Sequence, residues 1–264
     1  MTLSIPDITT QYGFTREGLG THSSRTMMLD ELRRLLALCP PTADQETYRA
    51  AIENNNVLLK STQSTRVKSF RHLRELYGLS PDILIFSALR TLWPETEEAQ
   101  PMLAMLCALA RDPSLRTTAP AVLPVAHGNR VTSQALAEAA AQVYPGLSKE
   151  TTLATIGRNA GSSWTQSGHL VGRANKTRVP APCHPTSVTY ALLLGHLCGA
   201  RGEGLFHTFW AHVLDRPVSV LEDLATAASR QGWLEYRHTG AITEITFDLL
   251  LQNSDKEPNV ERGR

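Results

Sequence analysis

Apolar residues recur at spacings of three and four over most of the chain, which is the pattern of amphipathic α-helices. The segment 24–38 is the first example, because Met28, Leu32 and Leu35 fall on one helical face and Pro40 ends the helix. Proline and glycine divide the rest of the chain near 40–41, 94, 113–128 and 179–185. This punctuation predicts a mainly α-helical protein built from four helical blocks.

The second block, 42–93, contains a polar interruption that separates two helices. Hydroxyl residues within 61–65 can cap a new helix, and Gly78 can end it. Its apolar face is expected to carry Val67, Phe70, Leu73 or Arg74, and Tyr77, with Lys68, Arg71 and His72 outside that face. From 80 to 111 the pattern predicts a helical hairpin whose apolar residues belong to the hydrophobic core.

The proline-rich, weakly patterned segment 111–128 is the best candidate for a connection between domains. A length of 264 residues also favours two domains over one. We therefore expect an N-terminal helical domain at 1–112, a C-terminal helical domain at 128–251, and a disordered tail at 252–264.

The C-terminal domain should begin with a helix–turn–helix pattern. Thr132 or Ser133 can cap a helix through Val143, and a second helix can start near Ser148. Helical spacing then recurs at 186–198, 202–214 and 219–231, followed by strand-like segments at 234–237 and 242–249. Three helices followed by a small β-hairpin are typical of a winged helix.

Composition and charge limit the classes of function. Hydrophobic residues make up 42% and charged residues 19%, as in ordinary folded proteins. The net charge is only +1, so attraction to an acidic polymer would have to come from local clusters. No apolar run approaches the ~20 residues of a membrane span, and the first residues lack the pattern of a secretory signal. We expect a cytoplasmic protein without membrane contact, whose scattered Cys39, Cys107, Cys183 and Cys198 are reduced.

The first cluster of positive charge lies at 60–78. This segment contains five basic residues and one acidic residue, Glu75, which gives a local charge of +4. A helix amino terminus rich in hydroxyls and followed by cations can hold a phosphate backbone. The alternative is a solvated helix face, which is the commoner explanation of such a run.

A second cluster of +4 lies between Arg130 and Pro182, with six basic and two acidic residues. No carboxylate occurs between Thr151 and Glu203. Hydroxyls and amides position phosphates and sugars, and a tryptophan can stack on bases. The alternative is a turn in which Trp164 and Leu170 fill the core. The candidate contacts here are Arg158, Trp164, Arg173, Lys176 and Arg178.

No pattern of catalysis or of metal binding stands out. The spacing of His169, Cys183, His184, His196 and Cys198 fits no compact zinc site. P-loop, GxSxG and HExxH motifs do not occur. We expect a non-enzymatic protein without cofactors, although a catalytic set dispersed through the fold stays open.

The segments Asn55–Arg66 and Leu73–Tyr77 resemble a region of BrxA-type proteins from bacterial BREX phage-exclusion systems. The resemblance implies a NusB-like helical bundle that binds DNA without catalysis and serves an antiphage defence system. It also implies DNA contacts at Lys60, Ser61, Thr62, Arg66, Lys68 and Arg71.

Two functional hypotheses follow. The first is a DNA-binding accessory with little sequence preference, for which RNA stays open as the polymer. The second is an assembly adaptor, whose winged helix contacts a larger methyltransferase, phosphatase-like or ATPase subunit of the defence system. Glu222 and Asp223 on the last helix of that module make it a poor reader of the major groove.

Overall fold

A computed structural model describes residues 5–144, 146, 150–240 and 242–251. The protein is mainly helical, with a small antiparallel strand pair near its C-terminal end, as the sequence predicts. The expected disordered tail and the expected helix start at Ser148 lie outside the described residues. None of the described helices is both long enough and apolar enough to span a bilayer.

The elements follow one another in a simple order. The α-helices are α1 (Leu29–Leu38), α2 (Gln45–Glu53), α3 (Gln63–Tyr77), α4 (Leu84–Leu92), α5 (Gln100–Arg111), α6 (Pro113–Arg116), α7 (Ser133–Val143), α8 (Glu150–Gln166), α9 (Pro185–Leu197), α10 (Phe209–Val213), α11 (Val218–Arg230) and α12 (Asp248–Leu251). The 3-10 helices are η1 (Asp7–Tyr12), η2 (Thr21–Ser23), η3 (Glu97–Ala99), η4 (Ala119–Ala121) and η5 (Gly202–His207). The strands are β1 (Arg130–Val131), β2 (Leu170–Val171), β3 (Lys176–Arg178), β4 (Glu235–Thr239) and β5 (Ile242–Thr246).

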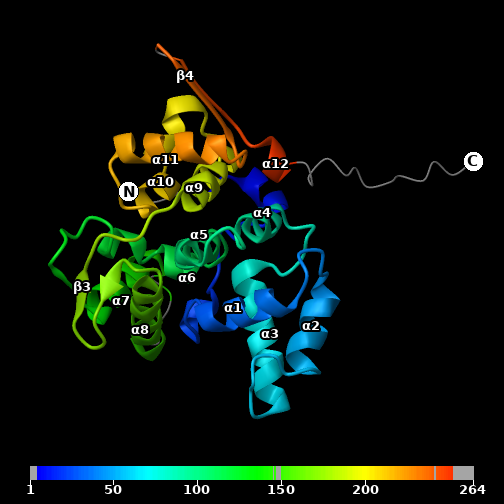
Figure 1. Cartoon of the computed structure of the whole chain (residues 1–264). Helices are drawn as coiled ribbons and strands as arrows, with labels where there is room; N and C mark the ends of the chain where they lie inside the picture. The colour runs from blue at the N-terminus through cyan, green and yellow to red at the C-terminus, as the bar shows by residue number, and fades with distance from the viewer. Residues whose placement is uncertain (1–4, 145, 147–149, 241, 252–264) are drawn as a thin grey trace, which may run out of the picture.

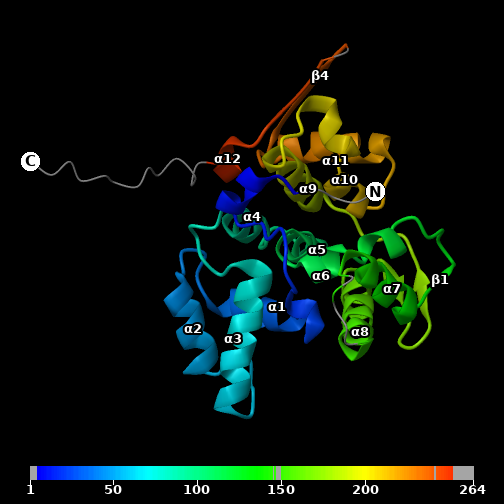
Figure 2. The same ribbon diagram turned by 180° about the vertical axis from the view of Figure 1, so that it is seen from behind.

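The helices are arranged around α5, which contacts α3, α4, α6, α8 and α9. In Figure 1, α9, α10 and α11 form an upper tier and α4, α5 and α6 cross the middle. Below them, α1, α2 and α3 lie on one side, and α7 and α8 lie on the other with β3. Figure 2 shows the same tiers from behind. Residues 102–110 of α5 are all buried, so this helix is the centre of the apolar core.

Local capping explains where several helices begin and end. The Thr62 hydroxyl accepts the N–H of Thr65 and caps α3, within the predicted range of starts. Thr132 caps α7 in the same way, as predicted. Gly78 ends α3 with a φ of 95°, a positive value that strains residues with a Cβ and that glycine adopts easily.

The segment 111–128, expected as a connection, forms α6 and η4 and packs into the protein. Asp112, Ser114, Leu115 and Ala119 are buried. One apolar cluster includes residues from both sides of this segment, from Ile5 to Leu250. The first part of this segment is packed and is not an exposed linker, whereas Pro120, Pro124 and residues 126–128 are exposed. The division into two domains stays a prediction.

Two small sheets complete the fold. The hairpin of β4 and β5 pairs Glu235 with Thr246 and Thr239 with Ile242, and it projects beyond the helices (Figure 1). A three-stranded antiparallel sheet in the order β1–β3–β2 was not predicted. Its strands have two or three residues each, too few to show an alternating pattern. This sheet places Lys176 beside Val131 of β1, next to α7 and α8.

Candidate nucleic-acid interface

A hollow of about 680 Å³ lies between α8 and the turn from β2 to β3. Three of the candidate cations line it, namely Arg158, Arg173 and Lys176. The other lining residues are hydroxyl, amide or small apolar ones: Val131, Ser133, Ser162, Thr165, Gln166, Gly172 and Ala174. No carboxylate is among these lining residues, so the hollow is a basic site with many hydrogen-bonding groups.

One face of α8 forms the wall of the hollow. Arg158, Ser162, Thr165 and Gln166 are spaced at i, i+4, i+7 and i+8, which places them on one side of a helix. Ile156, Ala160 and Trp164 point to the other side and are buried. Helical spacing in the acid-free stretch is the sequence signal for Ser162, Thr165 and Gln166, which we did not include as candidates.

Lys176 is the cation most firmly held in the hollow. Its ammonium donates to the Thr165 hydroxyl at 2.9 Å and approaches the Gly172 carbonyl at 3.5 Å. Burial lowers the pKa of Lys176. A Cβ on Gly161 would lie 3.2 Å from Lys176 Cε, so the glycine allows the lysine stem to pack against α8. The ammonium is thus positioned by oxygen atoms but is not neutralised by them.

The turn after β2 presents Arg173. Gly172 has φ of +99°, and a Cβ there would meet the Asn175 carbonyl oxygen at 2.2 Å, so this tight turn requires glycine. Arg130 of β1 donates to the side chain of Asn175 and supports the turn from the other strand. Arg173 is exposed at its tip.

Arg158 marks the edge of the basic hollow. Its guanidinium donates to the Thr155 hydroxyl at 2.9 Å. A neighbouring hollow, also lined by Arg158, contains Glu138 and Glu150 and is therefore less basic. Among the described residues, no ion pair neutralises Arg158, Arg173 or Lys176.

The cluster at the start of α3 is more strongly compensated. Lys60 pairs with Glu31 at 2.8 Å, and Arg71 lies 3.7 Å from Glu75. The Arg66 guanidinium donates to the carbonyls of Lys60 and Glu53, so it holds the loop before the helix. Ser61, Thr62, Lys68 and Arg71 are exposed. The count of +4 in this segment therefore overstates the charge that it offers to a ligand.

The segment 21–26 lies between α3 and α8. Thr21 donates to Glu75 of α3 at 2.7 Å, and Asn159 of α8 donates to the His22 carbonyl at 3.0 Å. Arg25 is exposed within this segment. Both α3 and α8 extend toward the lower end of the protein in the two views (Figures 1 and 2). Arg25 is thus an exposed cation on the segment that contacts both α3 and α8.

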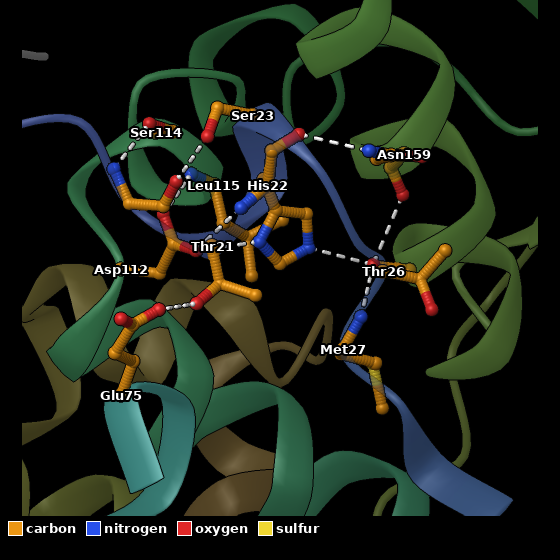
Figure 3. Close-up of polar contacts among 12 residues, drawn as sticks. Thr21, His22, Ser23, Thr26, Met27, Glu75, Asp112, Ser114, Leu115 and Asn159 are labelled. Atoms are coloured by element: carbon orange, nitrogen blue, oxygen red, sulfur yellow. Dashed lines mark hydrogen bonds and ion pairs between the residues drawn. The ribbon is translucent and has the colours of Figure 1, made fainter. Parts of the chain in front are cut away.

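His22 lies in a buried polar network near this junction (Figure 3). Its Nδ1 is 2.7 Å from Asp112 Oδ2, and its Nε2 is 2.7 Å from Ser163 Oγ. Burial alone would raise the pKa of Asp112, but the charge and hydrogen bond of His22, with the N–H groups of Leu115 and His22, lower it. Asp112 is therefore an ionised partner of His22.

The order Ser163, His22 and Asp112 is that of a serine hydrolase triad. All three residues are at most 1% exposed. Ser163 Oγ also accepts the N–H of Met27 at 2.9 Å and lies 3.0 Å from the Asn159 carbonyl, so its surroundings are filled. Because a nucleophile must reach its substrate, this arrangement is best explained as a structural link between η2, α6 and α8. No sequence motif signals it.

Trp164 and Arg178 are both fully buried, so the prediction that they contact nucleic acid is wrong. The indole N–H of Trp164 donates to Thr118 at 2.9 Å, as in the alternative that placed this ring in the core. Arg178 pairs with Asp215 at 2.8 Å.

The apolar face of α3 also differs from the prediction. His72, expected outside that face, is buried, whereas Val67, expected on it, is 44% exposed.

Metal ligands do not gather in the described part of the chain, where no group of three or more His, Cys, Asp or Glu residues could hold an ion. The four cysteines are free. Comparisons with protein-family models and with curated proteins find no match for this sequence.

Proposed function

We propose that this protein binds the phosphate backbone of nucleic acid in the hollow between α8 and the β2–β3 turn. The observation that supports this function best is the grouping of Arg158, Arg173 and Lys176 with no neutralising ion pair among the described residues. Cations and hydroxyls that surround one hollow match the oxygen atoms and negative charge of phosphate.

Backbone contacts position a nucleic acid without reading its bases. The proposed binding is therefore nearly independent of sequence, and duplex DNA is the polymer that we favour. A strand held in the hollow can continue past Arg25 toward Lys68 and Arg71 on α3, with Ser61 and Thr62 as further contacts. Lys60 and Arg66 contribute less, because each already has partners within the protein.

The resemblance of the segment around α3 to BrxA-type proteins is the basis for proposing a role in antiphage defence. In that role the protein is a non-enzymatic accessory of a BREX-type system, with a NusB-like bundle and no cofactor. The polymer would be bound and presented to other subunits and not cleaved or modified by this chain.

Fluorescence anisotropy with a labelled DNA duplex across a salt series tests the proposal. If each of the three cations in the hollow neutralises one phosphate, they should contribute about −3 to the log–log slope of affinity against salt, and contacts by Arg25, Lys68 and Arg71 would make the slope steeper. Lys176→Met should reduce that slope by about one, since it removes the ammonium and retains an apolar stem against Gly161. Arg158→Gln and Arg173→Gln should act similarly, and all should weaken binding equally across duplex sequences.

Arg237→Gln is the matched control, because it removes an exposed cation from the projecting hairpin. Its slope should equal that of the unmodified protein. Absent binding, or a slope that the three variants in the hollow leave unchanged, would contradict the proposal. The same series with duplex RNA and with single strands identifies the preferred polymer.

The second candidate function is an assembly adaptor. Helices α9, α10 and α11 followed by the projecting β4–β5 hairpin are consistent with a winged helix. Asp223 is exposed on α11, which suits a protein partner better than DNA. If Arg237→Gln lowered the salt slope and Lys176→Met did not, the hairpin would be the nucleic-acid contact and the adaptor hypothesis would lose its main support.

A further inference from the structure

A second hollow, of about 580 Å³, lies between the segment 119–127 and the end of α10. It shares no lining residue with the basic hollow at α8. Its size falls within the ~300–1,000 Å³ of small-molecule sites. This hollow has no part in the proposed nucleic-acid binding.

The walls are apolar and stiff. Leu123 and Phe209 face the hollow and rest on the apolar core behind it. Pro120, Pro124 and Pro217 supply further apolar surface, and their rings restrict the backbone of both walls. A preformed apolar wall binds the body of a small molecule with little cost of ordering.

The acidic group in the hollow is already neutralised. The Asp215 carboxylate pairs with buried Arg178 at 2.8 Å and with His127 at 3.1 Å. It also accepts the N–H of Ala181 at 3.1 Å. These three contacts occupy both oxygens and join the two walls.

The charged group of the hollow that has no ion-pair partner among the described residues is a cation, Arg216. Arg216 lines the hollow and donates to the Asp215 carbonyl at 2.9 Å. It makes no ion pair with a described residue. His212 is exposed and lines the same hollow as a further hydrogen-bonding group. The polar side of the site thus lacks one negative charge.

We infer that this hollow binds a small apolar carboxylate. The hydrocarbon or aromatic body lies against Leu123, Phe209 and the prolines, and the carboxylate pairs with Arg216. A guanidinium and a carboxylate can form two parallel hydrogen bonds, which fixes the orientation of the ligand. A cationic ligand of the same shape is disfavoured, because it would meet Arg216 with no free carboxylate to bind.

Titration with anilinonaphthalene sulfonate, an apolar aromatic anion, tests this site without nucleic acid. We expect a saturable rise in fluorescence that decanoate reverses, with decylammonium at least tenfold weaker as a competitor. Arg216→Gln should weaken decanoate about tenfold, as expected for loss of one partly exposed charge contact. Because the assay contains no nucleic acid, its outcome is independent of the proposed backbone binding.

Leu123→Glu places a carboxylate in the hollow and should abolish the decanoate-sensitive signal. Leu38→Glu is the matched control, because Leu38 is 65% exposed on α1, and it should leave the signal unchanged. Circular dichroism confirms that both variants are folded. If Leu123→Glu retained the signal, or if decanoate and decylammonium competed equally, the inference would be overturned.

Discussion

The buried His169 should make the protein sensitive to mild acid. His169 is fully buried, with its ring edge-on to Trp164 at 4.8 Å. Its Nε2–H donates to the Val213 carbonyl at 2.7 Å, and its Nδ1 lies 2.8 Å from the Ser167 hydroxyl. Burial is the main reason that the pKa of His169 falls from 6.5 to about 4. The folded protein therefore keeps this ring neutral at pH values where the unfolded chain protonates it.

The size of the effect follows from the two pKa values. Between 6.5 and about 4 the unfolded state binds one more proton at this site, so the free energy of unfolding falls as the pH falls. From pH 7 to pH 4.5 the loss from His169 alone should be about 2 kcal/mol. Asp112, whose pKa is lowered from 3.8, adds its own loss only at lower pH.

Urea unfolding at pH 7 and pH 4.5 measures this loss, and His169→Gln isolates it. Glutamine can donate to Val213 and does not titrate, so the variant should lose about 2 kcal/mol less between the two pH values. His238→Gln, at an exposed position of β4, is the control and should retain the full acid sensitivity. An equal loss in His169→Gln and in the unmodified protein would refute the reasoning.

Two further substitutions test other parts of the fold. Asp112→Asn should lower the free energy of unfolding by about 3 kcal/mol, because both carboxylate oxygens accept from buried groups of His22 and Leu115, and an amide can accept at only one of them. Urea unfolding measures this, and exposed Asp30→Asn should change little. Leu59→Asn should raise the free energy of unfolding by about 0.5–1 kcal/mol, since Leu59 has φ of 54° and asparagine tolerates that backbone better. A lower thermal midpoint for Leu59→Asn would contradict that explanation.

Several helix positions were predictable because they depend on nearby residues, although the predicted helix at 202–214 is instead η5 followed by the short α10. Thr62 and Thr132 cap helices through N–H groups three residues away, and Gly78 ends α3 through its own backbone. The C-terminal hairpin was predictable for the same reason, since β4 and β5 are consecutive in the chain. Interactions of short sequence range leave a pattern that can be read directly.

The buried network and the small sheet were not predictable, because their partners are far apart in the chain. His22 contacts Asp112 and Ser163, which lie 90 and 141 residues away. Strand β1 pairs with β3 across more than forty residues, in segments too short for a period. In the sequence, polar residues at these positions cannot be distinguished from exposed surface residues, because their partners are distant in the chain.

Charge counting failed for a related reason, and this failure sharpens the choice of site. Both segments have a sequence charge of +4. In the fold, however, Lys60 pairs with Glu31 of α1, and Arg178 pairs with Asp215, which follows α10. Such pairing cannot be seen in a window of sequence, because the neutralising residue lies outside it. What matters to a phosphate is the charge that remains after folding. By that measure Lys176, held by hydroxyl and carbonyl oxygens and paired with no described carboxylate, is the residue on which backbone binding should depend most.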